Sequence, residues 1–132
     1  MKEAVPLEYR VPYADTDQMR VVYYANYLRY FEMAREEMLR AIGCPYTKLE
    51  EEGYALPVCE AYCRYRKSAL FEDVLTITSR VTEVQGVRCR IECAITRQNG
   101  DLIADGWTIH AFLKNGRPAR PPRFLLDAME SR

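Results

Sequence analysis

The sequence has a single histidine, a single tryptophan and no net charge, since 19 basic residues balance 19 acidic ones. A chain without excess positive charge attracts neither nucleic acid nor an anionic membrane, so neither is an expected partner. No apolar run approaches the roughly 20 residues of a membrane span. The first ten residues, MKEAVPLEYR, lack the apolar core of a signal peptide. We therefore expect a cytoplasmic protein with one domain over residues 1–132.

Cysteine is present in an odd number, five, and no two cysteines form a Cys-X-X-Cys pair. With one histidine in the chain, these residues do not have the spacing of a zinc site. We expect no metal and no cofactor. The cysteines are interpreted as small buried thiols in a reducing compartment.

The most informative stretch, residues 13–42, joins a polar turn to a long apolar helix. The turn carries Asp15 and Asp17, and the apolar run 21–24 leads into a helix predicted to begin near Ala25 or Asn26. Apolar residues then recur at three- and four-residue steps: Tyr27, Tyr30, Phe31, Ala34, Met38, Ala41 and Ile42. That spacing predicts one continuous buried face. Further apolar residues at 28, 33 and 39 indicate a helix covered on most sides, which Gly43 ends.

Alternation of apolar and polar residues predicts strands over 7–13, 74–84 and 87–96. The stretch 55–65 is rich in β-forming residues but apolar on both faces, and a last strand is predicted over 102–113. Pro12 places the first strand at an edge or at its own end. A short helical segment is predicted over 47–52, and a short amphipathic tail around 124–129. Asn99-Gly100 is the strongest hairpin signal and predicts a type I′ turn. One long helix followed by an antiparallel meander indicates an α+β fold with a sheet curled around the helix.

Two acids before a helix can supply the parts of an acyl-transfer site. Ester or thioester hydrolysis needs a nucleophile or base and a donor for the oxyanion. The chain has no Gly-X-Ser-X-Gly motif, and His110 lies in a predicted strand, where we interpret it as structural. Asp15 and Asp17 precede the free N–H groups of a helix start. Either aspartate could instead shape the turn, and from the residues alone both interpretations stay open.

The motif YADTD, followed by VVYY, NY and FE over residues 13–32, resembles the signature of the 4-hydroxybenzoyl-CoA thioesterase family, which includes YbgC-type members. The resemblance implies a hot-dog fold with a central helix wrapped by about five strands. It also implies hydrolysis of an acyl-CoA thioester. By this resemblance Asp17 is the catalytic carboxylate, as nucleophile or general base, and the backbone N–H of Tyr24 is the oxyanion donor. Asp15 keeps a structural role.

Two positions depart from the family pattern. Tyr24 stands where other members carry His, and a mechanism that requires this His does not fit the chain. A mechanism that uses the backbone N–H is unaffected, because every residue other than proline has that group. Arg20 stands where Gly is common. Because Gly often permits close backbone approach, Arg20 indicates an altered loop.

The expected partner is acyl-CoA, or alternatively an acyl carrier protein. Candidate substrate-binding residues are Tyr23, Tyr27, Arg66, Lys67, Arg88 and Arg90. The tyrosines could line an acyl pocket, but they also fit a plain core, and each cation also fits a solvated strand face or turn. Two other hypotheses are a hot-dog module that binds acyl-CoA without turnover and a hydratase of the same fold. The open sheet edges predict a homodimer, with a homotetramer as a further step.

Overall fold

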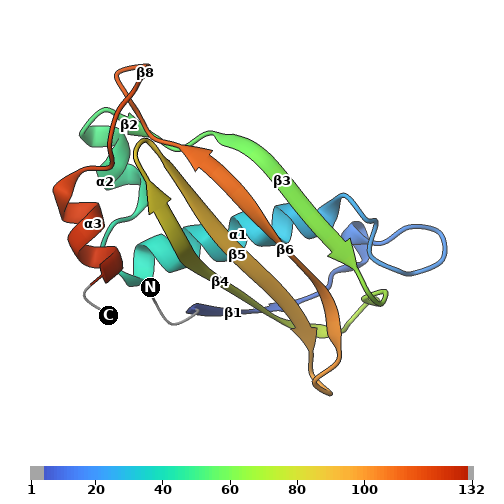
Figure 1. Ribbon diagram of the computed structural model, residues 1–132. Helices are drawn as coiled ribbons and strands as arrows, with labels where there is room; N and C mark the ends of the chain where they lie inside the picture. The colour runs from blue at the N-terminus through green and yellow to red at the C-terminus, as the bar shows by residue number, and fades with distance from the viewer. Residues whose placement is uncertain (1–4, 131–132) are drawn as a thin grey trace.

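The computed structural model describes residues 5–130 and contains one five-stranded antiparallel sheet that curls around a long helix (Figure 1). The strand order is β1-β4-β5-β6-β3. The elements are β1 (Val5–Arg10), α1 (Asn26–Ala41), β3 (Val58–Tyr65), β4 (Val74–Gln85), β5 (Arg88–Arg97) and β6 (Leu102–Ala111). The predicted α+β hot-dog fold is thereby confirmed. None of the described helices is long and apolar enough to cross a membrane.

Smaller elements gather at the end of the molecule beyond the last turn of α1 (Figure 1). They are α2 (Tyr46–Glu51), β2 (Tyr54–Ala55), β7 (Leu113–Lys114), β8 (Arg117–Pro118) and α3 (Arg123–Glu130). The three short strands form a second sheet in the order β2-β7-β8. A 3-10 helix, η1 (Tyr13–Asp15), lies on the chain between β1 and α1. The strand predicted over 7–13 therefore ends early, because Pro12 precedes this helical turn.

The type I′ turn is at a different hairpin from the predicted one. At Asn99-Gly100 only Gly100 has a positive φ, 91°, and its N–H donates to the carbonyl of Arg97 at 2.8 Å. A type I′ turn needs positive φ at both central residues, so the prediction for this pair was wrong. Asn115 and Gly116, between β7 and β8, both meet the requirement with φ of 52° and 82°.

The helix α1 is buried on one face only. Its buried residues are Tyr27, Tyr30, Phe31, Ala34, Arg35, Met38 and Leu39. Leu28 is 40% exposed and Ala41 is exposed, so the expectation of a helix covered on most sides was wrong for this chain. The sheet covers the side of α1 that it faces (Figure 1), and the exposed residues lie away from that side. Arg35, a charged residue inside this face, was not anticipated.

Inward-facing residues of the central strands alternate as predicted. Cys89, Ile91 and Cys93 of β5 are all buried. Burial raises the pKa of the Cys89 and Cys93 thiols to about 12, so both stay protonated. Cys59 is instead exposed on β3, which corrects the expectation that every thiol is buried.

The strand β3 lies at one edge of the sheet, and almost all of its residues are exposed. The predicted strand over 55–65 is broken at Leu56 and Pro57 into β2 and β3. Gly106 of β6 allows β3 to approach closely, because a Cβ at this position would lie 1.9 Å from the carbonyl oxygen of Tyr62. A side chain at this position would therefore push β3 away from β6.

Candidate active site

Asp17 lies in a tight loop immediately before α1. Its N–H donates to the carbonyl of Val21 at 2.9 Å, and its own carbonyl accepts from the N–H of Arg20 at 3.0 Å. The carboxylate oxygen Oδ1 accepts from the N–H of Met19 at 2.8 Å. Within residues 5–130 the other oxygen has no hydrogen-bond or ion-pair partner, and the residue is exposed. One oxygen therefore holds the side chain in place while the other stays open to a reactant.

Arg20 shows why glycine suits this loop. Its φ is 65°, in the left-handed region that side chains rarely adopt. The guanidinium lies 5.4 Å from the centre of the Phe71 ring, and the Arg20 carbonyl accepts from the N–H of Phe71 at 3.2 Å. The loop thus keeps the conformation that a glycine would favour. The side chain turns toward Phe71 and does not line the pocket that contains Asp17.

The start of α1 offers a free donor beside Asp17. The N–H groups of Asn26 and Tyr27 donate to the carbonyls of Tyr23 and Tyr24, and the N–H of Tyr23 donates to the carbonyl of Asp15. The N–H of Tyr24 has no acceptor among residues 5–130. A free N–H at the positive end of a helix dipole is suited to stabilise a developing oxyanion.

Asp15 joins the Asp17 loop to α1 and β1. Its carboxylate accepts hydrogen bonds of 2.8 Å from the phenols of both Tyr9 and Tyr30, and it forms an ion pair of 2.6 Å with Arg29. Its carbonyl also accepts from the side-chain amide of Asn26 at 2.9 Å. Burial and the Asp15 carboxylate raise the pKa of the Tyr30 phenol, so this phenol remains a donor. Both carboxylate oxygens of Asp15 are therefore occupied by protein groups, and its structural role stays a prediction.

A pocket of about 370 Å³ brings together six of the residues predicted from the sequence. They are Asp17, Tyr23, Tyr24, Tyr27, Arg66 and Lys67. Tyr65 also lines this pocket, with its ring centre 6.2 Å from that of Tyr24 and 5.4 Å from that of Tyr27. Tyr65 was not predicted, because nothing local at the end of a strand indicates that it faces a helix start distant in the sequence.

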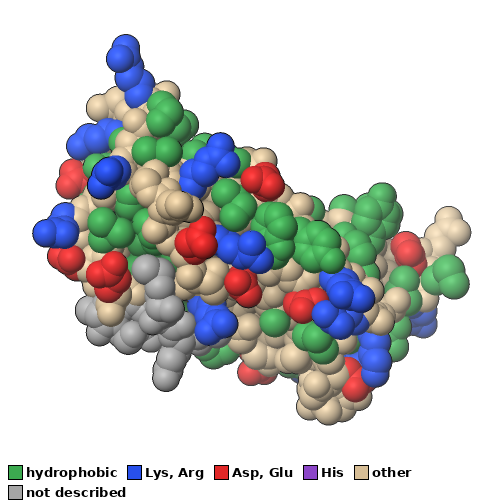
Figure 2. Space-filling view, viewed as in Figure 1, with side chains coloured by type: hydrophobic (Ala, Val, Ile, Leu, Met, Phe, Trp, Pro, Cys, Tyr) green, Lys and Arg blue, Asp and Glu red, His purple; other side chains and the backbone are tan. Residues whose placement is uncertain are grey.

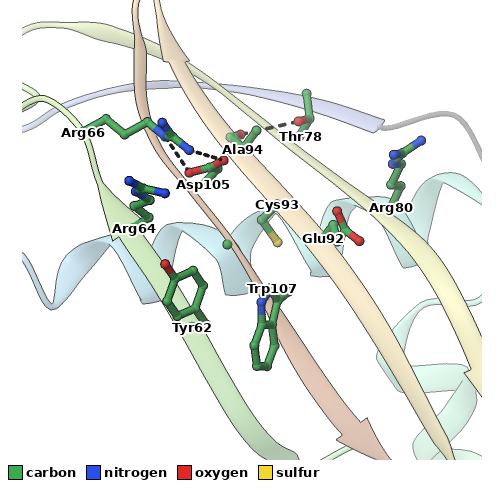
Figure 3. Close-up of a pocket in the computed structure, with 11 residues that line it drawn as sticks. Tyr62, Arg64, Arg66, Thr78, Arg80, Glu92, Cys93, Ala94, Asp105 and Trp107 are labelled. Atoms are coloured by element: carbon green, nitrogen blue, oxygen red, sulfur yellow. Dashed lines mark hydrogen bonds and ion pairs between the residues drawn. The ribbon is translucent and has the colours of Figure 1, made fainter.

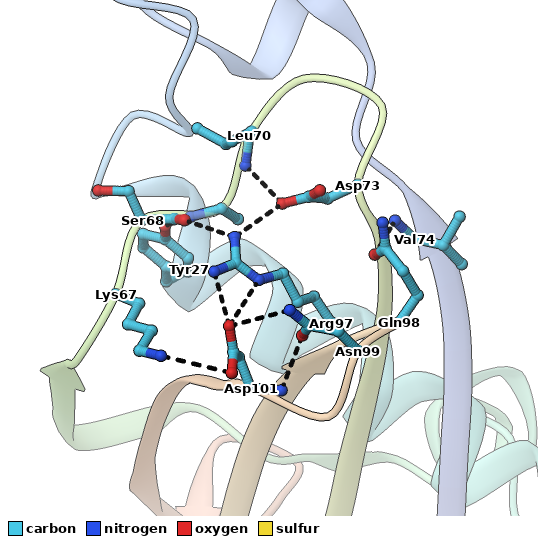
Figure 4. A network of polar contacts seen from close by, with 11 residues as sticks. Tyr27, Lys67, Ser68, Leu70, Asp73, Val74, Arg97, Gln98, Asn99 and Asp101 are labelled. Carbon is cyan, nitrogen blue, oxygen red and sulfur yellow. Dashed lines mark hydrogen bonds and ion pairs between the residues drawn. The ribbon is translucent and has the colours of Figure 1, made fainter.

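The loop that follows β3 forms one wall of the pocket and is fixed by polar contacts (Figure 4). The phenol of Tyr27 accepts from the N–H of Ala69 at 3.0 Å, so this tyrosine serves the core as well as the pocket. Lys67 forms an ion pair of 3.3 Å with Asp101, which also binds Arg97 at 2.8 Å. The hydrogen bond from Arg97 is the largest cause that lowers the pKa of Asp101 to about 2.

Arg88 and Arg90 do not line this pocket in the single chain. Arg88 begins β5 and lies 4.0 Å from Glu60, whereas Arg90 lies over the Trp107 ring at 4.7 Å on the outer face of the sheet. Tyr65 and Ile95 both pair with Ala104, so Ile95 marks the level of the pocket on β5. Arg88 and Arg90 are seven and five residues from Ile95, which is roughly 23 and 17 Å of strand. These two cations are therefore near the opposite end of the sheet from Asp17.

His110 is fully buried behind the sheet and does not line the pocket. Its Nδ1 lies 3.1 Å from the carbonyl oxygen of Leu56, which can only accept, so Nδ1 carries the proton. Its Nε2 then accepts from the hydroxyl of Thr108 at 2.8 Å. Burial lowers the pKa of His110 to about 4, so the ring is neutral near pH 7. Both ring nitrogens are satisfied, as expected of a structural histidine.

Comparison with known proteins agrees with the fold and with the motif. The model of the thioesterase-like superfamily matches residues 11–129. The chain is 39% identical over 89 residues to the acyl-CoA thioesterase YbgC of Haemophilus influenzae, covering 67% of this chain and 65% of that protein. It is 30% identical over 113 residues to the 1,4-dihydroxy-2-naphthoyl-CoA hydrolase of Thermosynechococcus vestitus, covering 85% and 77% of the two chains. The crystal structure of a hypothetical protein from Thermus thermophilus superposes with a TM-score of 0.92 at 32% identity, over 98% of each chain. The chain therefore belongs to the thioesterase-like superfamily and has the hot-dog fold.

Proposed function

We propose that this protein hydrolyses an acyl-CoA thioester to a free acid and CoA at the pocket that contains Asp17. It belongs to the thioesterase-like superfamily, and its YbgC relative from Haemophilus influenzae is an acyl-CoA thioesterase. The observation that carries the proposal is that a carboxylate with one open oxygen, at Asp17, and a free backbone N–H, at Tyr24, border the same pocket. Those are the two groups that acyl transfer needs.

In this mechanism Asp17 acts as a nucleophile on the thioester carbonyl or as a general base on water. In either case the carbonyl oxygen gains negative charge, which the N–H of Tyr24 at the start of α1 stabilises. The C–S bond then breaks, and CoA leaves as a thiolate that takes up the proton released by the attacking water or a proton from solvent. On the nucleophilic route water next hydrolyses the mixed anhydride on Asp17, which releases the acid and restores the carboxylate. Tyr23 and Tyr65 supply apolar ring surface around the acyl group, because both are partly exposed at the pocket.

The active assembly is proposed to be a dimer paired through β3, which doubles to a tetramer. The two edge strands differ, since β1 contains Pro6 whereas β3 contains no proline. Proline discourages strand pairing at an edge. The exposed large apolar residues of β3 are Val58, Tyr62 and Tyr65. We expect light scattering at micromolar concentration to give a dimer or tetramer, and a monomer would overturn this part of the proposal.

Antiparallel pairing of β3 with its copy gives Arg88 a role in the site. The two-fold axis would lie near the middle of the strand, so the Val58 end of one copy would adjoin the Tyr65 end of the other. Arg88 is close to that Val58 end, beside Glu60. The partner's Arg88 would then approach the pocket that Tyr65 lines, where it could bind a phosphate of the substrate.

Release of free thiol from a panel of acyl-CoAs tests the proposal directly. The panel includes aromatic and short aliphatic acyl groups, and the same acyl groups on an acyl carrier protein test the other thiol partner. Steady release above the spontaneous rate is the expected result. Tight binding without release would instead support a module that holds acyl-CoA. A hydratase is disfavoured, because His110 is buried away from the pocket and cannot work with Asp17.

A further inference from the structure

We propose that the outer face of the sheet holds a second subsite, which binds the adenosine phosphates of the CoA substrate. The inference rests on the proposed function, because it assigns a place to the part of acyl-CoA that does not react. A hollow of about 320 Å³ lies on this face, across β3, β4, β5 and β6 (Figure 3). This volume is within the range of small-molecule sites. Arginines and aromatic rings line it together with the acids Glu92 and Asp105, and Figure 2 shows basic, acidic and hydrophobic side chains gathered on this face of the molecule. Cations and aromatic rings suit a nucleotide, because cations bind its phosphates and rings stack on its base.

Two arginines in this hollow are available for phosphate. Arg66 is paired with Asp105 at 2.9 Å. Arg64 of β3 and Arg80 of β4 have no carboxylate within ion-pair distance in the described part of the chain. Guanidinium groups bind phosphate oxygens through two parallel hydrogen bonds, so unpaired arginines on a concave surface favour a phosphorylated ligand.

The aromatic part of the hollow is formed by Trp107 of β6 and Tyr62 of β3. Their rings are stacked, with centres 5.7 Å apart and an angle of 23° between the planes. Arg90 lies on Trp107 at 4.7 Å, and Tyr62 is 47% exposed. Any nucleobase can stack on the exposed surface of such a pair, and this stacking contributes to its affinity. Adenine therefore has a surface on which to lie next to the arginines.

Arg66 connects this hollow to the Asp17 pocket, because it lines both of them. It follows Tyr65, the last residue of β3, so the two sites lie on opposite faces of the sheet around the end of this strand. The pantetheine arm of CoA would pass over Arg66 from the reacting thioester to the phosphates. Pairing through the edge of β3 leaves the outer face accessible in a dimer.

Truncated substrates test the subsite through turnover. The double variant Arg64→Ala/Arg80→Ala should raise KM for acyl-CoA by about 10- to 100-fold, the effect of losing charge-assisted hydrogen bonds. With the same acyl group on pantetheine, which lacks the nucleotide, KM should change less than about twofold. Arg117→Ala, on the exposed β8 hairpin, is a matched control and should leave both KM values unchanged. Equal effects on the two substrates, or no effect on either, would overturn the subsite.

A binding measurement decides the question independently of turnover. Trp107 is the only tryptophan in the sequence, so its fluorescence reports on this hollow alone. Adenosine 3′,5′-bisphosphate should change the fluorescence saturably in the parent and much less in Arg64→Ala/Arg80→Ala. A saturable change that is identical in the two proteins, or none in the parent, would contradict the proposal. A parent that binds this probe but releases no thiol from any substrate would refute the proposed function and leave the subsite standing.

Discussion

The phenol of Tyr30 donates a hydrogen bond of 2.8 Å to the carboxylate of Asp15, and both side chains are buried. Tyr9 and Arg29 bind the same carboxylate, so Asp15 connects β1 and α1 two residues before Asp17. An asparagine at this position would present an NH₂ group to donors that need an acceptor.

Asp15→Asn is therefore expected to lower the free energy of unfolding by about 2 kcal/mol while turnover of the folded protein falls less than about tenfold. Urea unfolding and steady-state kinetics at one temperature measure the two effects. Tyr9→Phe removes a single hydrogen bond of the same cluster and should cost about 1 kcal/mol. Unchanged stability with a large loss of kcat would make Asp15, and not Asp17, the catalytic carboxylate.

Buried His110 makes stability depend on pH in a defined window. Its folded-state pKa of about 4 lies below the value near 6.5 of an unfolded chain. Between these values the unfolded chain binds a proton that the folded protein does not bind, so stability falls as the pH falls. The loss from pH 6.5 to pH 4 should be about 3 kcal/mol. In His110→Asn the dependence in this window should be much weaker, and an equally steep dependence would show that other groups cause it.

The left-handed backbone of Arg20 predicts an order of stability among variants. Arg20→Gly should unfold at the same or a higher urea concentration than the parent, because a side chain in this conformation costs roughly 1–2 kcal/mol. Arg20→Val should be the least stable, since branching at Cβ makes the strain worse. Both folded variants should retain turnover, because Arg20 does not line the pocket. Inactive Arg20→Gly would reveal a contribution of this side chain that the geometry does not suggest.

A variant of Tyr24 tests whether the oxyanion is stabilised by the phenol of this residue or by its backbone N–H. Tyr24→Phe removes the phenol but leaves the N–H that has no acceptor among the described residues. If this N–H is the oxyanion donor, kcat should fall less than about tenfold. A much larger decrease in kcat, with KM unchanged, would identify the phenol as a catalytic acid or donor.

Sequence reasoning was most accurate where the structure depends on local order. The motif with Asp17 and the apolar spacing of α1 are local, and they predicted a helix start near Ala25 or Asn26, close to the observed start at Asn26. The same stretch contributes Asp17 and three tyrosines to one pocket. The pair Asn115-Gly116 was recognised only as the end of a strand. It has the same sequence as the pair at 99 and 100, so the two residues alone do not tell which pair forms the type I′ turn. At the first pair Asn99 does not have a positive φ, and the N–H of Gly100 donates to the carbonyl of Arg97, so the turn is of another type.

Features that depend on distant segments could not be predicted. Tyr65 reaches the pocket because β3 ends beside the start of α1, and the outer hollow needs four strands in one order. The exposure of β3 was also hidden, since an apolar composition indicates burial until the strand is known to lie at an edge. Arg35 lies on the buried face of α1 although it is charged, so the apolar periodicity gave no sign of its burial. Its Nε donates a hydrogen bond of 2.9 Å to the phenol of Tyr46, a residue that is distant from it in the sequence.

Turnover by Asp17→Asn is the measurement that tests the central claim most directly. Asparagine is nearly isosteric with aspartate, and its side-chain oxygen can still accept from the N–H of Met19, so the loop should be preserved. It can neither ionise nor attack as a carboxylate. Thiol release from the best acyl-CoA substrate should therefore fall by about a hundredfold or more, with acyl-CoA binding and stability retained. Activity close to that of the parent would contradict the carboxylate mechanism.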